Sequence, residues 1–193
     1  MATGDGAERL AAFSDGVVAI IVTIMVLDLR PPHGVGMAAL WPLWPTLVSY
    51  VLSFLFVCIG WVNHHQLLRQ VERASPGLIW SNMGFLFTLS LIPFGTAYMA
   101  EQRMAPFTVA VYAFIFLMST VAFIPFEAVV AGQNRAHPER AAGDRRAVLR
   151  NGLALVLYAA AIPMAYWSRW GAFAMILGCC LLYFAPQRIA QRG

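Results

Sequence analysis

The chain contains no lysine and few charged residues of any kind, since only 11% of its 193 residues are charged. A soluble domain carries about 25% charged residues. This scarcity, together with 60% hydrophobic residues and a mean hydropathy of +0.68, excludes a soluble protein. No polar stretch is long enough to form the core of a separate soluble domain. We therefore predict a single all-α membrane domain over residues 1–193.

Cysteines are also few, and none of the three has the setting of a disulfide or a metal ligand. Cys58, Cys179 and Cys180 lie within apolar runs, and adjacent cysteines are poorly placed to bridge each other, so we expect inert, buried thiols. The His64-His65 pair has no Cys or carboxylate at ligand spacing beside it, and neighbouring helical residues point about 100° apart. We expect no metal site, no cofactor and, because no nucleophile–base pair is found, no enzymatic activity.

Apolar runs long enough to cross a bilayer occur six times along the chain. Turn or charge signals separate them, the longest over residues 133–150 and the shortest at Ser168-Arg169. Pro93, Pro125 and Pro163 fall inside the third, fourth and fifth runs and predict kinks there. The six predicted transmembrane helices cover about residues 10–29, 43–68, 77–98, 105–130, 148–167 and 170–187.

An even number of helices places both termini on one side of the membrane. The distribution of arginines indicates which side this is. With the N-terminus inside, ten arginines fall in cytoplasmic segments, and only Arg30, Arg103 and Arg169 fall outside. The positive-inside rule therefore predicts that both termini are cytoplasmic. This distribution also accounts for the net charge of +4, so nucleic-acid binding is not indicated. The basic segment 133–150 either serves topology or contacts anionic lipid.

Ser14 and Asp15 lie inside the first apolar run, where a carboxylate costs about 2.5–3.5 kcal/mol on insertion scales. At about 1.5 Å per residue, Asp15 lies about 7 Å from the cytoplasmic end of its helix. The same depth is predicted for His64, His65, Asn82 and Glu127. These polar groups either lock the packing of the helices or relay protons or ions, and the spacing leaves both interpretations open.

Beyond Asp15, the first helix carries Ile20, Ile24 and Leu27 at spacings of four and three residues. Residues at these spacings share one face of a helix, and Thr23 flanks it. The stripe either packs against lipid or core, or lines a pore shared by several copies of the chain. Apolar rings around a symmetry axis can gate such a pore by dewetting. The spacing alone does not choose between these interpretations.

Three motifs resemble those of the transmembrane protein 175 family of potassium channels. Arg9-x-x-x-Phe13-Ser14-Asp15, with Ala19-Ile20 and Thr23 beyond it, closely resembles the signature of that family. Trp61-x-x-His64-His65 resembles its second-helix motif, and Leu89-Ser-Leu-Ile-Pro93-Phe94 resembles its third-helix motif. These motifs fall within residues 9–94, and the last three apolar runs match only in number and character.

The resemblance implies a potassium-favouring cation channel in a bacterial inner membrane, built as a homotetramer around a central pore lined by the first helix. Ile20 would then form the main constriction, Ile24 and Leu27 further apolar rings, and Thr23 a polar contribution to selectivity. The network holding the pore helix would comprise Arg9, Phe13, Ser14, Asp15, Trp61, His64, His65 and Asn82. The expected partners are potassium ions, membrane lipids and further copies of the chain.

The chain has no Thr-Val-Gly-Tyr-Gly run, which excludes a carbonyl-lined filter of the usual potassium-channel type. Selectivity must therefore come from another device. The alternative function is a proton-coupled transporter or proton channel, in which Asp15 and His64 or His65 form the relay. A membrane-embedded enzyme has little support, because no catalytic group of residues is found.

Overall fold

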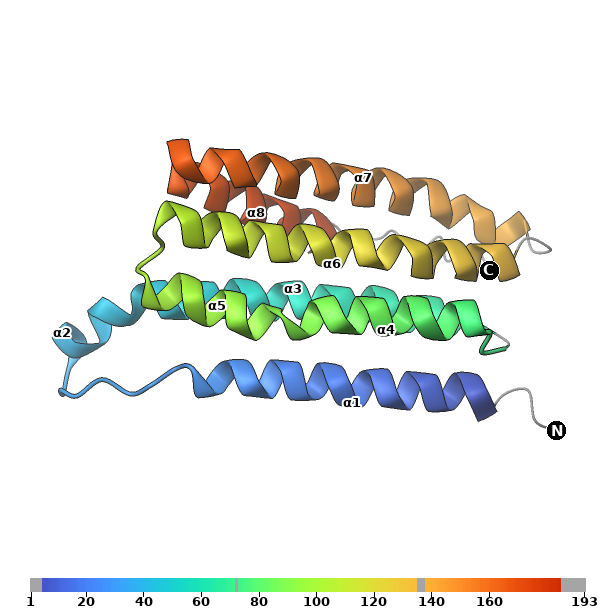
Figure 1. The fold of residues 1–193 in the computed structure, drawn as a ribbon, viewed down its shortest axis with the longest axis horizontal. Coiled ribbons are helices and arrows are strands. Elements are labelled where there is room, and N and C mark those ends of the chain that lie inside the picture. Colours follow the sequence, from blue (N-terminus) through green and yellow to red (C-terminus); the bar gives the residue numbers. More distant parts are fainter. Residues whose placement is uncertain (1–4, 72, 135–137, 185–193) are drawn as a thin grey trace, which may run out of the picture.

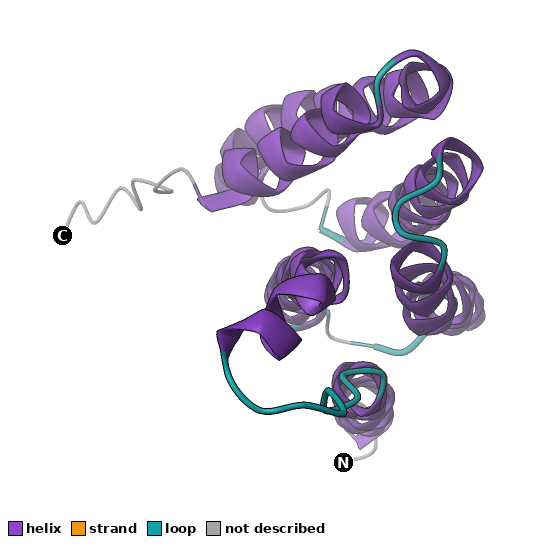
Figure 2. Cartoon of the chain, turned by 90° about the vertical axis from the view of Figure 1, so that its left-hand side faces the viewer, coloured by secondary structure: helices purple, strands orange, loops and turns teal. Residues whose placement is uncertain are grey.

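The computed structural model describes residues 5–71, 73–134 and 138–184, which form helices joined by loops (Figures 1 and 2). These elements are α1 (Asp5–Leu27), α2 (Met37–Leu40), the short 3-10 helix η1 (Trp41–Leu43), α3 (Trp44–Leu68), α4 (Pro76–Ser90), α5 (Ile92–Glu101), α6 (Pro106–Gln133), α7 (Pro138–Trp167) and α8 (Arg169–Phe184).

The helices cross the molecule in alternating directions, as Figure 1 shows. We call the end at which α1 begins the near end of the bundle, and the end at which α1 finishes the far end. Five of the described helical stretches are long and apolar enough to cross a membrane, and α8 is apolar but shorter. The protein is therefore a multi-pass helical membrane protein. The spans are Gly6–Leu27, Met37–Leu68, Pro76–Glu101, Pro106–Gln133 and Val148–Trp167.

The third crossing is broken rather than continuous. α4 ends at Ser90, Leu91 is a turn, and α5 begins at Ile92. Pro93 has no amide hydrogen and cannot continue the hydrogen-bond ladder, which explains an interruption where the sequence predicted a kink. The helices α6 and α7 remain helical through Pro125 and Pro163.

The segment 133–150, predicted as a loop, is largely helical, because α7 begins at Pro138. The prediction followed the apolar run and therefore ended where hydrophobicity ended. Alanine, glutamate and arginine are good helix formers in water, so the helix continues beyond its apolar part. The last predicted helix ends at Phe184 within the described residues, and the predicted continuation to residue 187 lies outside them.

The core of the bundle is built around α6, which packs against α4, α5, α7 and α8. The large side chains Tyr112, Phe116, Phe126 and Tyr158 are almost completely buried there. Helix α1 lies at the edge of the bundle and packs on α3, α4 and α5 (Figure 2). The three cysteines are unbridged, and the adjacent pair Cys179-Cys180 is buried.

Candidate functional site

Helix α1 has one buried face and one exposed face within this chain. Leu10, Ser14, Val18, Ile21 and Met25 form the buried stripe, at the spacing expected for one side of a helix. The opposite side carries the four side chains that the sequence predicted as one face. The exposed fractions are 58% for Ile20, 46% for Ile24 and 75% for Leu27, and Thr23 is also exposed.

The hydroxyl of Thr23 is turned back onto its own helix. Its Oγ1 lies 3.0 Å from the carbonyl oxygens of both Ala19 and Ile20. A hydroxyl has one hydrogen, which this contact uses, and two lone pairs that remain available as acceptors. The exposed face of α1 thus carries one polar oxygen among apolar side chains.

A buried polar chain joins the opposite face of α1 to α4 and α3. The hydroxyl of Ser14 donates to the carbonyl of Leu10 at 2.8 Å and accepts from Asn82 Nδ2 at 3.0 Å. Asn82 Oδ1 lies 2.6 Å from His64 Nε2, and because an amide oxygen only accepts, the imidazole donates. Ser14, Asn82 and His64 are all buried. Three helices are therefore connected by one continuous set of hydrogen bonds.

The His64 ring is stacked on two aromatic side chains. It stacks on Phe85 with 5.7 Å between ring centroids, and on Phe126 with 4.8 Å. These rings come from α4 and α6, so the imidazole is confined by helices other than its own. Packing and the hydrogen bond to Asn82 therefore hold the ring in the same orientation.

A second contact ties α1 directly to α3. The indole Nε1 of Trp61 donates to Asp15 Oδ1 at 2.7 Å, and the Trp61 ring stacks on His65 with 5.3 Å between centroids. Hydrogen bonds to ionised groups are stronger than bonds between neutral groups. The costly carboxylate of the first helix therefore has a partner one helix away, as its depth required.

The structure brings together six of the eight residues predicted to hold the first helix: Ser14, Asp15, Trp61, His64, His65 and Asn82. Arg9 and Phe13 lie apart from this cluster on exposed positions of α1, and 53% of Phe13 is exposed. Among the residues that the structure describes, neither side chain is joined to the other members. Both point away from the neighbouring helices of their own chain.

Glu127 belongs to a different cluster, although its predicted depth is the same. Asn151 Nδ2 contacts both carboxylate oxygens of Glu127, at 2.8 and 2.7 Å, and Asn151 Oδ1 accepts from the Tyr183 hydroxyl at 2.8 Å. The Arg150 guanidinium lies 4.2 Å from the centroid of the Tyr183 ring and donates to Asn63 Oδ1 at 3.2 Å. Counting residues along helices yields depth but not the side of the bundle, so the sequence did not separate the two clusters.

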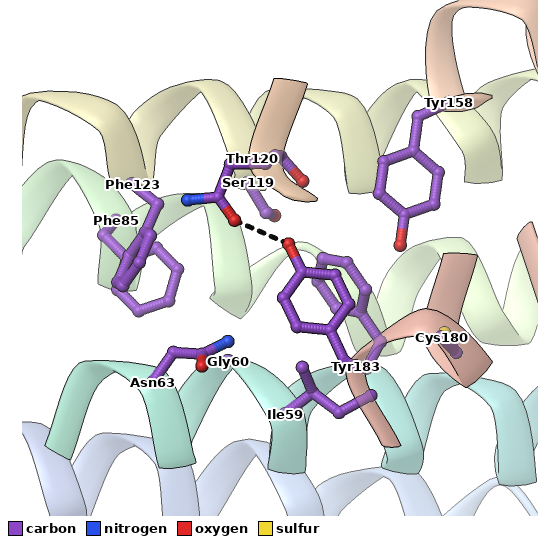
Figure 3. Close-up of a pocket in the computed structure, with 12 residues that line it drawn as sticks. Ile59, Gly60, Asn63, Phe85, Ser119, Thr120, Phe123, Tyr158, Cys180 and Tyr183 are labelled. Atoms are coloured by element: carbon purple, nitrogen blue, oxygen red, sulfur yellow. Dashed lines mark hydrogen bonds between the residues drawn. The ribbon is translucent and has the colours of Figure 1, made fainter. Parts of the chain in front are cut away.

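A small cavity of about 40 Å³ lies beside this second cluster (Figure 3). It is lined mainly by aromatic and aliphatic side chains from α3, α4, α6, α7 and α8, with polar groups that include Asn63, Thr120 and Tyr183. A cavity of this size has room for about three or four water molecules, at about 10–15 Å³ each. Asn63 follows Trp61 by two residues and so lies on the far side of α3 from α1. The cavity is therefore separate from the exposed face of α1.

Among the described residues, no three His, Cys, Asp or Glu side chains come close enough to hold a metal ion. In the described cluster, the Ser14 hydroxyl donates to the Leu10 carbonyl, and His64 contacts Asn82. Buried polar contacts hold one face of α1 against the bundle. The other face of α1 is exposed within this chain.

Comparison with known proteins places this arrangement in a family. A family model described as the endosomal/lysosomal potassium channel TMEM175 matches residues 9–93. A protein from Chryseobacterium sp. (strain P1-3), named as a potassium channel, is 33% identical over 188 residues, which cover 96% of each chain. A bovine protein, named as the endosomal/lysosomal proton channel TMEM175, is 35% identical over 113 residues, which cover 52% of this chain and 22% of the bovine protein.

A solved structure agrees with these sequence matches. The crystal structure described as a lysosomal potassium-selective channel TMEM175 homolog from Chamaesiphon minutus superposes with a TM-score of 0.79 at 28% identity. The superposition covers 92% of this chain and 96% of the other. The resemblance noted in residues 9–94 is confirmed, and it extends as a fold over most of the chain. The chain belongs to the TMEM175 family, which is a family of ion channels and not a class of enzymes.

Proposed function

We propose that this chain forms a passive cation channel that favours potassium, with four copies around a central pore. The exposed face of α1 lines that pore. Ile20 forms the main constriction, with Ile24 and Leu27 as further apolar rings. Thr23 supplies the polar oxygen at this level. The choice of potassium as the conducted ion is supported by the relatives that are named as potassium channels. The solved homologue supports the fold.

The two-faced character of α1 is the observation that carries the proposal. Helix α1 lies at the edge of the bundle, so its outer face is open to contact with further copies of the chain. Here buried polar residues on three helices hold one face of α1 inward, and interhelical hydrogen bonds of this kind stabilise membrane helix contacts. The rotation that they fix points Ile20 and Ile24 away from the bundle. A defined outward face fits a symmetric pore.

The apolar constriction also suggests how conduction is controlled. A narrow apolar ring loses its water and blocks ions until it widens. Four copies of Ile20 around an axis would form such a ring, and the positioning of α1 would set its width. Arg9, Phe13, Ser14, Asp15, Trp61, His64, His65 and Asn82 are the proposed network that positions α1, with Arg9 and Phe13 acting at contacts between copies.

The proposed setting is a bacterial cell membrane with both termini in the cytoplasm. In that orientation the near end of the bundle is cytoplasmic, and it receives most of the arginines, as the positive-inside rule requires. Potassium ions and lipids are the remaining partners. No cofactor is needed for passive conduction.

The test replaces Ile20 with Asn and records single channels in planar bilayers under a potassium gradient. The polar amide wets the constriction, so we expect higher conductance and a lower potassium-to-sodium permeability ratio. Val156→Asn is the matched control, because Val156 is an exposed aliphatic residue on α7. Discrete openings with a potassium reversal potential support a channel. A current that requires a proton gradient, or an Ile20→Asn variant that matches the wild type, contradicts the proposal.

Proton conduction is the second candidate function, because the bovine relative is named as a proton channel. The geometry favours the packing role for Asp15, since its described partner is the Trp61 indole, which donates but cannot accept a proton. We therefore expect Asp15→Asn to weaken the tetramer in detergent. An intact Asp15→Asn tetramer that selectively loses proton current would instead support a relay through Asp15 and the histidines.

A further inference from the structure

Three buried hydroxyl groups meet in the far half of the bundle, away from the polar cluster on α1. Ser53 Oγ lies 2.6 Å from Thr96 Oγ1 and 2.7 Å from the Tyr112 hydroxyl. The side chains come from α3, α5 and α6, and their exposed fractions are 0%, 2% and 0%. We call these three residues the hydroxyl clamp.

The direction of the hydrogen bonds in the hydroxyl clamp follows from counting hydrogens. Thr96 donates its only hydrogen to the carbonyl of Ile92 at 2.7 Å, so its oxygen accepts from Ser53. The Ser53 hydrogen is then used, so Tyr112 donates to Ser53 at 2.7 Å, with a longer contact of 3.4 Å to the Ser49 carbonyl. The chain runs from α6 through α3 to a backbone carbonyl of α5. Each hydroxyl both donates and accepts except Tyr112, so the removal of any one breaks the chain.

The chain ends at the place where the third crossing is interrupted. Ile92 is the first residue of α5, directly after the turn at Leu91. Pro93 donates no hydrogen bond, so the backbone ladder is thinned at this turn, although Leu91 N still donates to the Thr88 carbonyl at 3.2 Å and Gly95 N to the Leu91 carbonyl at 3.1 Å. The hydroxyl clamp holds the beginning of α5 to α3 and α6 and so adds a side-chain constraint where the backbone ladder is weakest.

Helices α3 and α5 form the support for the far half of α1. Helix α1 packs against both, and in Figure 1 α5 lies opposite the later part of α1 while α4 lies opposite its earlier part. Ile21 and Met25 are buried on this side, with 4% and 0% exposed. Among the described residues, α1 makes no side-chain hydrogen bond to another helix beyond Asp15. The position of its far half therefore depends on where α3 and α5 stand.

We infer that Ser53, Thr96 and Tyr112 are positioning residues for the ion path. They set the spacing of α3 and α5 and thereby the radius at which α1 holds Ile24 and Leu27. This inference rests on the proposed channel function, and it adds a second support to the one at Ser14 and Asp15. The near support fixes the rotation of α1, and the hydroxyl clamp fixes the position of its far half.

The first test removes a single oxygen from the clamp by Tyr112→Phe and measures the potassium-to-sodium permeability ratio. We expect a change of about threefold, which is the equilibrium equivalent of one average interhelical hydrogen bond in a membrane. Tyr158→Phe is the matched control, because Tyr158 is equally buried on α7 and takes no part in the clamp. Thr96→Val should reproduce the change and Thr96→Ser, which keeps the hydroxyl, should restore the wild-type ratio.

The second test needs no current. Spin labels at Val26 on α1 and Phe107 on α6, both exposed, report the far half of α1 in tetramers diluted with unlabelled chains. Labels at Ala12 and Trp80, also exposed, report its near half. We expect Tyr112→Phe to broaden the distance distribution of the far pair and to leave the near pair unchanged.

The outcomes separate this inference from the channel proposal. A wild-type protein without potassium current contradicts the channel, while the distances still test the clamp. An unchanged far-pair distribution in both Tyr112→Phe and Thr96→Val overturns the clamp, as does equal broadening of both pairs. If Tyr112→Phe does not fold, Thr96→Val and Thr96→Ser carry the same comparison, and equal ratios in these two variants overturn the inference.

Discussion

Asn82 holds the polar chain between α1 and α3, and its replacement by Leu tests whether this chain stabilises the fold. Leu has the same branched side-chain shape and number of heavy atoms, and it removes both the donor to Ser14 and the acceptor for His64. Ser14 keeps its bond to the Leu10 carbonyl. The His64 ring is held between Phe85 and Phe126 and cannot turn toward another acceptor. The substitution therefore leaves one buried donor unpaired.

The expected loss can be estimated from these contacts. Interhelical hydrogen bonds in membrane proteins contribute about 0.6 kcal/mol on average and at most about 1.7 kcal/mol. A buried donor without a partner costs about 1–3 kcal/mol. Two lost bonds and one orphaned donor together lower the free energy of unfolding by about 2–4 kcal/mol.

Reversible unfolding in detergent mixed with increasing SDS measures this free energy. Thr88→Val is the matched control, because Thr88 lies on the same helix, is also buried and bonds only to the Phe85 carbonyl of its own turn. We expect the control to lose less than about 0.5 kcal/mol. Equal losses in Asn82→Leu and Thr88→Val would refute the reasoning, because the interhelical bonds would then contribute nothing measurable.

Two further predictions concern contacts of α1 and α5. A double-mutant cycle of Asp15→Ala and Trp61→Phe, measured by the same unfolding assay, should yield a coupling of about 1–2 kcal/mol, and a coupling near zero would show that the 2.7 Å contact is not stabilising. Gly95→Ala should destabilise by about 1 kcal/mol, because its Cβ would lie 2.7 Å from Ile115 Cδ1. Adding Ile115→Val removes that atom and should recover the loss, and failure to recover it would contradict the steric explanation.

The helix bounds show how much of the fold can be predicted from the order of residues along the chain. Hydrophobic runs and the positions of arginine and proline placed the crossings close to where the structure has them. The errors occur where a segment is helical without being apolar, or apolar without being continuously helical. Residues 138–147 are polar and yet helical, because a helix needs good helix formers and not apolar ones. The third crossing is apolar throughout and yet interrupted at Leu91.

For the candidate site, the sequence predicted the membrane depth of the polar residues but not which neighbours they contact. The sequence placed Ser14, Asp15, His64, His65, Asn82 and Glu127 at one level. Only the structure shows that Glu127 bonds to Asn151, while Ser14 and Asp15 bond to Asn82 and Trp61. Neither Asn151 nor Tyr183 was singled out from the sequence, although an asparagine directly after Arg150 at the start of an apolar run is a visible signal.

The hydroxyl clamp left no such signal. Ser53, Thr96 and Tyr112 lie far apart in apolar runs, and serine, threonine and tyrosine are common there because each can bond to its own helix. Their meeting depends on three crossings having particular rotations. No spacing within one helix carries that information.

The sequence by itself determined that the chain crosses a membrane several times, which family it belongs to, and at what depth its costly polar groups lie. These properties follow from hydrophobicity and from a fixed rise of about 1.5 Å per residue, both of which are read along one dimension. The tertiary structure alone decided which polar groups meet, which face of α1 is buried, and where the third crossing breaks. Those outcomes depend on the rotation and tilt of each helix against its neighbours, which are set by side-chain packing between segments distant in the chain.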